Sequence, residues 1–233
     1  MREFNALVGY PEPKQPRFVG PDLRTIRNRI TASYRGQEFY DGDRNNGYGG
    51  FTYDGRWVPI AKFIVREYGL TERSAVLQIN SEKGFLLHDL QQLVPGITIR
   101  GVEVSEYAIA HAMPSVRPWI QQAPFTPLPF SDHKFDLVIA VGAVYALTLA
   151  DALACLKEIQ RVGKGKSFIT LASYETEGDK RLFEWWTLLG STLLRKEEWR
   201  EVLRHAGYTG DYHFTNAEKL KLRRAEDEKM NSQ

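Results

Sequence analysis

The sequence predicts an α/β fold with a mostly parallel central sheet and helices on both faces. Short apolar stretches such as Ala75–Ile79 and Phe135–Val141 alternate along the chain with segments of helical periodicity. Near-continuous apolar strands are typical of parallel sheets, which are buried on both faces. The composition, 42% hydrophobic and 26% charged over 233 residues, is typical of a globular protein with one large domain and attachments.

Residues 1–56 are predicted to form an N-terminal arm, a helix and a glycine-rich lid. Several prolines near the start favour an extended arm. Leu23, Ile26 and Ile30 then recur at helical spacing, with Asp22 as the expected N-cap.

The start of the chain is basic. Residues 1–35 carry seven Lys or Arg side chains against three Asp or Glu side chains. One hypothesis is a solvated basic face on a helix that docks through its apolar side. The other is a grip on a phosphate or another anionic substrate.

The segment from Tyr40 to Trp57 is rich in glycine. Five of the fourteen residues from 42 to 55 are glycine, and the aromatic residues Tyr48, Phe51 and Tyr53 are interleaved with them. A loop that covers a ligand uses glycine for close backbone approach and aromatic rings for cover. A structural cluster of turns is the alternative interpretation.

The main α/β domain is expected at residues 57–215, followed by a charged tail at 216–233 that is frayed helix or disordered. The expected strands are Ala75–Ile79, Thr98–Val104, a short strand near Ile120, Phe135–Val141, Lys166–Ala172 and Tyr208–Phe214. The expected helices are Trp57–Tyr68, Lys83–Leu93, Ser105–Met113, Leu149–Val162, Glu177–Leu189 and Glu197–Ala206.

Local signals set the ends of these helices. Gly69, Gly163 and Gly207 stand just past helical segments, where glycine favours a stop. Pro95 ends the second helix, and Ser105 is a favourable N-cap for the third.

Ligands of this architecture bind outside the carboxyl ends of the strands. Glu103 ends the second expected strand, nineteen residues after Gly84. A carboxylate at this spacing accepts hydrogen bonds from both hydroxyls of a ribose. The alternative is a surface glutamate at a strand end.

The segment from Tyr40 to Trp57 matches a YDG…GYGG…YDGRW pattern, and further motifs follow it in order: Val76–Phe85, Gly101–Ile109, Leu128–Ile139, Leu156–Gly165 and Gly207–Tyr212. In these motifs the chain resembles the class I methyltransferases that use S-adenosylmethionine, and within them a bacterial and archaeal group. The resemblance implies a Rossmann-like methyltransferase fold over about residues 38–215.

The chain departs from this family where the cofactor is bound. An acid is usual at Gln78, a glycine at Asn80, and a glycine or small residue at Glu82. Asn80 is expected to crowd the turn, and Glu82 to repel the cofactor carboxylate unless it points to solvent. Pro124 stands where the family has a polar residue facing the adenine.

The resemblance implies a set of site residues. Those expected to bind S-adenosylmethionine are Tyr48, Gln78, Asn80, Ser81, Gly84, Glu103, Val104, Phe125 and Val141. The segment 140–146 is almost wholly apolar, and Tyr145 is its one conventional acid or base. Tyr145 and Asp43 are the expected catalytic residues, and no metal site is expected.

Three hypotheses of function follow. The first is methyl transfer to an oxygen or nitrogen of a small-molecule or glycan acceptor. The second is a catalytically silent methyltransferase fold that stabilises another protein as a partner or subunit. The third is a pocket repurposed for another nucleotide-like or sugar ligand.

The composition restricts the partners. A net charge of +2 gives no general attraction to nucleic acid or to an anionic membrane, so neither is expected, whereas a protein partner or a homo-oligomer stays open. The single cysteine, Cys155, can form no internal disulfide. We expect a cytoplasmic protein.

Overall fold

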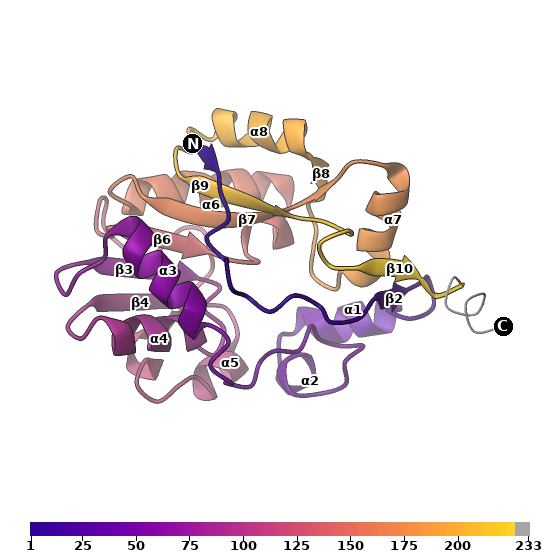
Figure 1. Cartoon of the computed structure of the whole chain (residues 1–233), viewed down its shortest axis with the longest axis horizontal. Helices are drawn as coiled ribbons and strands as arrows, with labels where there is room; N and C mark the ends of the chain where they lie inside the picture. The colour runs from indigo at the N-terminus through magenta and orange to yellow at the C-terminus, as the bar shows by residue number, and fades with distance from the viewer. Residues whose placement is uncertain (227–233) are drawn as a thin grey trace.

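The computed structural model describes residues 1–226, and its centre is an eight-stranded sheet (Figure 1). The strands lie in the order β1-β9-β7-β6-β3-β4-β5, with β8 beside β7, and every recorded pair is parallel. Their bounds are β1 Arg2–Glu3, β3 Ala75–Ile79, β4 Thr98–Glu103, β5 Ile120–Gln122, β6 Leu137–Ala140, β7 Ser167–Tyr174, β8 Leu194–Arg195 and β9 Asp211–Thr215. The predicted fold class is confirmed.

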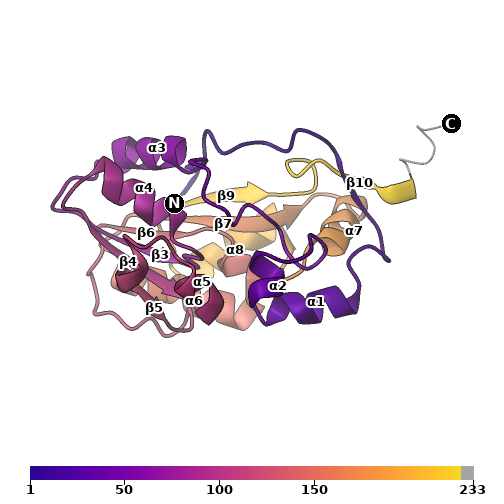
Figure 2. The same ribbon diagram turned by 90° about the horizontal axis from the view of Figure 1, so that it is seen from below.

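Helices cover both faces of this sheet. Figure 2 shows α3 and α4 on one side and α6 and α8 on the other. The helices are α1 Ile26–Ser33, α2 Gln37–Tyr40, α3 Val58–Tyr68, α4 Phe85–Leu93, α5 Glu106–Ala110, α6 Leu149–Val162, α7 Glu177–Trp186 and α8 Lys196–His205, with short 3₁₀ helices η1 Arg117–Trp119 and η2 Val144–Ala146.

Alternation along the central strands divides the interior into two cores. Leu77 and Ile79 of β3 pack in the core beneath α6 and α8. Val76, which precedes Leu77 in the same strand, packs in the core beneath α3 and α4. Successive strand side chains point to opposite faces, so a strand buried on both sides is apolar throughout.

The connections make β3 the point at which the chain reverses direction across the sheet. From β3 the chain moves outward to β4 and β5, then returns to β6 on the other side of β3. The crevice for a ligand in such a sheet lies at the carboxyl ends of the strands beside this reversal. This places the ends of β3, β4 and β6 at the candidate site.

Both ends of the described chain join sheets, which sequence reasoning missed. β1 pairs with β9 at the edge of the central sheet. β2 (Arg17–Val19) pairs with β10 (Leu222–Arg224) in a separate two-stranded sheet that packs on α7. The tail is therefore not frayed or disordered from residue 216 to 226. Residues 227–233 lie outside the described residues.

Helix α1 does not dock through its apolar side, as was expected of an amphipathic helix. Its N-cap is Thr25, not Asp22, and Asn28 completes the cap by accepting from the backbone N–H of Thr25 at 2.9 Å. The side chains of Ile26 and Ile30 are 72% and 50% exposed. Arg24 and Arg29 are half-buried instead. The helix docks through its polar side.

Candidate functional site

The turn between β3 and α4 keeps an unusual backbone. Asn80 and Glu82 have φ of 59° and 52°, and Gly84 has φ of 75°. A Cβ atom on Gly84 would meet Val116 at 2.7 Å. The left-handed geometry that suits glycine is therefore retained although two of the three positions carry side chains. The amide of the Asn80 side chain donates to the carbonyl of Val141 at 3.2 Å, and the expected crowding of a cofactor at this turn stays a prediction.

Glu103 is fully buried at the end of β4. One carboxylate oxygen accepts the backbone N–H of Glu82 at 2.8 Å. The other accepts the N–H groups of Val104 and Ser105 at 2.9 and 3.0 Å. A carboxylate has about four acceptor positions, so roughly one stays available. Glu103 is thus a buried hydrogen-bond acceptor held by the backbone, and not a surface glutamate.

Arg35, in the loop after α1, lies against this carboxylate. Its guanidinium is 4.0 Å from Glu103 and donates to Oδ1 of Asn80 at 2.7 Å. It also lies 5.9 Å above the ring of Phe125. The backbone carbonyl of Arg35 accepts the hydroxyl of Ser105, the N-cap of α5, at 2.5 Å. The N-terminal segment therefore closes over the ends of β3 and β4.

Glu82 faces this cluster and does not point to solvent, so the expected repulsion of a cofactor carboxylate stays a prediction. Burial, and then the charge of Glu103, raise the pKa of the Glu82 carboxyl to about 8, while Arg35 and Lys83 oppose the rise. A carboxyl that titrates close to neutral pH has the acidity required of a general base. The sequence signal was present, since an acid stood where the family has a small residue.

A second ion pair ties the glycine-rich segment to the sheet. The buried ammonium of Lys83 donates to both oxygens of Asp41 at 2.6 and 2.8 Å, and Tyr107 donates to the same carboxylate at 2.8 Å. Burial raises the pKa of Asp41, but these hydrogen bonds outweigh it and hold the pKa below its usual value. Tyr53 adds a third tie by donating to Asp89 at 2.6 Å.

Tyr48 links the lid to the segment after α7. Its hydroxyl accepts the N–H groups of Leu188 and Leu189 at 2.7 and 2.9 Å, and it lies 3.2 Å from the hydroxyl of Thr187. Its ring packs against Trp186 with centroids 4.8 Å apart. Tyr48 therefore holds the glycine-rich segment against residues 186–189.

The two expected catalytic residues lie in different surroundings. Tyr145, in η2 after β6, is half-buried, and burial raises the pKa of its phenol well above the usual value. It stays protonated near neutral pH and can donate a hydrogen bond. Asp43 is exposed in the lid, where Oδ1 accepts the N–H of Asn45 at 2.7 Å.

The other expected cofactor residues line the strand ends or lie beneath them. Oε1 of Gln78 and Oγ of Ser81 are buried, and neither has a hydrogen-bond partner in the part of the chain that the structure describes. Phe125 is buried beside Arg35, whereas Pro124 is exposed. Val104 and Val141 are half-buried, and their backbones bond Glu103 and Asn80 respectively.

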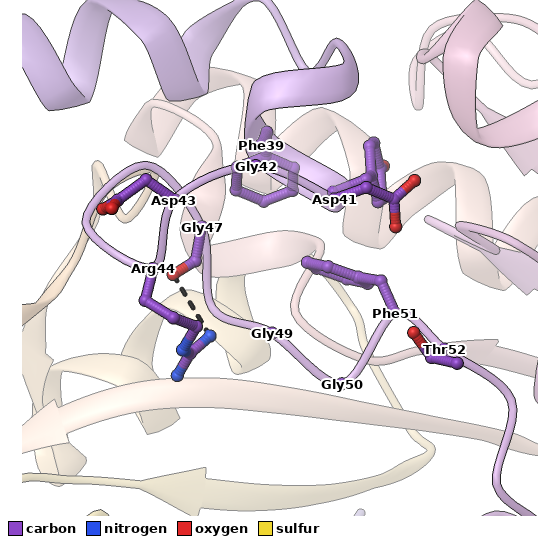
Figure 3. Close-up of a pocket in the computed structure, with 11 residues that line it drawn as sticks. Phe39, Asp41, Gly42, Asp43, Arg44, Gly47, Gly49, Gly50, Phe51 and Thr52 are labelled. Carbon is purple, nitrogen blue, oxygen red and sulfur yellow. Dashed lines mark hydrogen bonds between the residues drawn. The ribbon is translucent and has the colours of Figure 1, made fainter.

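A cavity of about 340 Å³ opens within the lid (Figure 3). Asp41, Asp43, Arg44 and Phe51 are among the residues that line it. Sequence reasoning placed a ligand cover here but missed Arg35, Lys83 and Arg44 as the charged groups. These side chains contact segments that are distant in the sequence, so no local sequence pattern indicates their role.

No helix within residues 1–226 has the length and hydropathy needed to cross a membrane. Within the same residues, no group of three or more His, Cys, Asp or Glu side chains is arranged to hold a metal ion.

Comparison with known proteins gives a family match over part of the chain. Residues 77–171 match a family model described as a methyltransferase domain. No curated protein matches the chain.

Solved structures share the fold. A chain of the complex between the Haloferax volcanii Trm112 methyltransferase activator and a methyltransferase is 22% identical, with 77% of this chain and 75% of that chain covered and a TM-score of 0.53. A Bacillus halodurans methyltransferase is 16% identical, with 63% and 68% covered and a TM-score of 0.52.

The fold also occurs with another chemistry. The cyclase SpnF is 15% identical, with 81% and 74% covered and a TM-score of 0.54. Since one fold can host several activities, these likenesses establish the fold alone. The domain match, with this fold, supports the class I methyltransferase family, methyl transfer and S-adenosylmethionine as the cofactor.

The framework of the site fits this cofactor. The left-handed turn, the remaining acceptor position of Glu103 and the unpartnered buried Oε1 of Gln78 are groups that a nucleoside and an ammonium can engage. Arg35 opposes the fit, because its guanidinium lies against the same carboxylate. A bound ribose at Glu103 would therefore lie beside the Arg35 guanidinium.

Proposed function

We propose that this chain transfers a methyl group from S-adenosylmethionine to an oxygen or nitrogen of a small-molecule or glycan acceptor. The observation that carries the proposal is Glu103, buried at the end of β4 beside the left-handed turn of residues 80–84. An acceptor carboxylate at this point of an open α/β sheet suits the hydroxyls of a ribose.

The roles of the residues follow from their surroundings. Glu103 would hold the sugar hydroxyls, and Asn80, Ser81 and Gly84 would form the turn against the cofactor. The buried acceptor of Gln78 suits an ammonium group. Phe125, Val104, Val141 and Tyr48 would supply the remaining walls.

S-adenosylmethionine, when bound, supplies an electrophilic methyl group on a sulfonium. The chain itself has to hold the attacking atom in line with that methyl and to exclude water. Glu82, with its pKa raised to about 8, is the candidate base for an acceptor hydroxyl. Tyr145 would donate a hydrogen bond, and the exposed Asp43 would bind the acceptor from the lid.

A protein partner or a second copy of the chain is a further part of the proposal. It is supported by the exposed Leu23, Ile26, Ile30 and Tyr34 of the α1 region. The comparison with a methyltransferase in complex with an activator is consistent with a partner. The catalytically silent alternative is not favoured by the domain match.

The test is calorimetric titration of S-adenosylmethionine and S-adenosylhomocysteine into the full chain. We expect micromolar binding, weakened by about tenfold or more in Glu103→Gln because a charged acceptor is lost. Glu106→Gln, on the exposed first turn of the next helix, is the matched control. Far-ultraviolet circular dichroism of each variant checks its folding.

Absence of binding at millimolar ligand to the folded wild-type chain would contradict the proposal. So would equal affinity of the wild-type chain and a folded Glu103→Gln variant. The first outcome would direct the search to the silent alternative, with Arg35 as the group that closes the site.

A further inference from the structure

Three arginines gather beside the glycine-rich lid without a carboxylate to balance them. Arg17 lies in β2, Arg24 precedes α1, and Arg44 lies in the lid; we call them the arginine cluster. None of the three belongs to an ion pair within residues 1–226. Other arginines of the chain, such as Arg2 and Arg161, bond carboxylates directly.

The cluster converges on neutral carbonyl groups. Nη2 of Arg24 and Nη1 of Arg44 both donate to the carbonyl of Gly47, at 3.2 and 3.3 Å. Arg24 also donates to the carbonyls of Trp186 and Arg44. Two cations on one carbonyl oxygen repel each other, and an anion between them would remove that cost.

Burial and mutual repulsion act on the same groups. The pKa of Arg24 is lowered to about 10, mainly by burial, with Tyr48 opposing the shift and the charges of Arg44, Arg17 and Arg29 adding to it. Burial and then Arg44 lower the pKa of Arg17. The three guanidinium groups of the cluster therefore lie near one another with no carboxylate paired to them within residues 1–226.

Glycine at position 49 makes room for this arrangement. Gly49 has φ of 70°, and a Cβ atom there would collide with Nη1 of Arg44. Figure 3 shows the Arg44 side chain extending from the loop, with the carboxylate of Asp43 pointing away from its guanidinium. Asp41 also lines the cavity, but its charge is paired with Lys83.

The orientation of α1 agrees with a role for the cluster. Ile26 and Ile30 of the helix are exposed, whereas Arg24 and Arg29 are half-buried. Burying unpaired guanidinium groups in place of apolar side chains costs free energy of folding. A bound anion would offset this cost, because it provides charge-assisted hydrogen bonds for the free N–H groups.

We infer that the arginine cluster binds a phosphate group of the methyl acceptor, so that the substrate is a phosphorylated small molecule. A phosphate carries about two negative charges and several acceptor oxygens, which matches several guanidinium forks. Arg44 lines the same cavity as Asp41, whose ion-pair partner Lys83 lies in the turn after β3, so the cavity lies between the cluster and the candidate cofactor site. Only the identity of the ligand as the methyl acceptor rests on the proposed function.

The experiment measures binding of inorganic pyrophosphate, at constant ionic strength set with sodium chloride, by calorimetry. We expect saturable binding, weakened about tenfold or more in Arg44→Gln through loss of charge-assisted hydrogen bonds. Arg27→Gln, an exposed arginine on α1, is the matched control and should bind as the wild-type chain does. Arg17→Gln provides a second variant in case Arg44→Gln does not fold.

Equal weakening in Arg44→Gln and Arg27→Gln, or no saturable binding, would overturn the inference. Binding lost in Arg223→Gln and Arg224→Gln but kept in Arg44→Gln would also overturn it, in favour of a polyanion on the exposed face of β10.

A parallel titration of S-adenosylmethionine into Arg44→Gln separates this inference from the proposed function. Pyrophosphate binding that depends on Arg44, in a chain that does not bind S-adenosylmethionine, supports the anion site and contradicts methyl transfer. Binding of S-adenosylmethionine without pyrophosphate binding contradicts the anion site alone.

Discussion

Two regions of the molecule differ in how their charges are neutralised. At the ends of β3 and β4, Glu103 accepts three backbone N–H groups and lies against Arg35, while Lys83 pairs with Asp41. In the arginine cluster, guanidinium groups meet neutral carbonyls. The charges of the first region are balanced by other groups of the protein. The guanidinium groups of the second region have no carboxylate partner within residues 1–226.

The difference separates two ways of building a binding site. A balanced site has to release an internal partner before it binds, so its residues contribute to stability as well as to function. An unbalanced site gains its partner only from the ligand, and its residues add little to the stability of the free protein. The two regions should therefore respond differently to substitution.

The largest effect is expected at Glu103. Glu103→Ala leaves three N–H groups at the end of β4 without their acceptor, so we expect the free energy of unfolding to fall by about 3–4 kcal/mol. Urea unfolding followed by circular dichroism measures the change, with Glu106→Ala as the exposed control. A loss below about 1 kcal/mol would mean that water replaces the carboxylate and that this region is not internally balanced.

A smaller, pH-dependent effect is expected at Glu82. Its pKa is raised from 4.5 to about 8 in the folded chain, so the folded state holds the proton more tightly than the unfolded state. Stability should fall as the pH rises from about 4.5 to about 8, because the unfolded chain gives up this proton first.

Glu82→Gln should remove that loss. We expect the variant and the wild-type chain to be about equally stable at pH 4, and the variant to be the more stable of the two at pH 9, where the wild-type carboxyl has to carry its charge in the folded state. Urea unfolding at the two pH values is the measurement. An equal difference at both would show that Glu82 does not titrate in this range and would remove it as the candidate base.

The smallest effect is expected in the arginine cluster. Arg44→Gln removes a charge that has no ion-pair partner within residues 1–226 and relieves repulsion on Arg17 and Arg24. We expect a change in unfolding free energy within about 0.5 kcal/mol in chloride buffer. A loss above about 1 kcal/mol would place Arg44 with the balanced region and weaken the contrast.

Much of the fold follows from local sequence patterns. The strand at Ala75–Ile79 and the helix at Leu149–Val162 have the predicted bounds, and Ser105 caps α5 as expected. Helix caps, glycines at helix ends and apolar runs each involve only a few consecutive residues, so they can be recognised from the local sequence. The short strands β1, β2 and β10 were missed, since their pairing partners lie far away in sequence.

The candidate site was predictable only in outline. Glu103 and the turn of residues 80–84 could be placed because strand ends in a parallel sheet meet at one edge. The hydrogen bond from Asn80 to the carbonyl of Val141 joins distant segments and could not be predicted locally. The same holds for the charges of Glu103, Arg35 and Lys83 around Glu82.

Local sequence patterns were enough to predict the class of fold, the order of its main elements and the strand end at which Glu103 lies. The contact of Arg35 with Glu103, and the orientation of α1 that exposes Ile26 and Ile30 and half-buries Arg29, appear only in the folded structure. Periodicity defines the two faces of a helix but not which face finds a partner. That choice depends on contacts between distant segments, whose charges and hydrogen bonds exist only once the chain is folded.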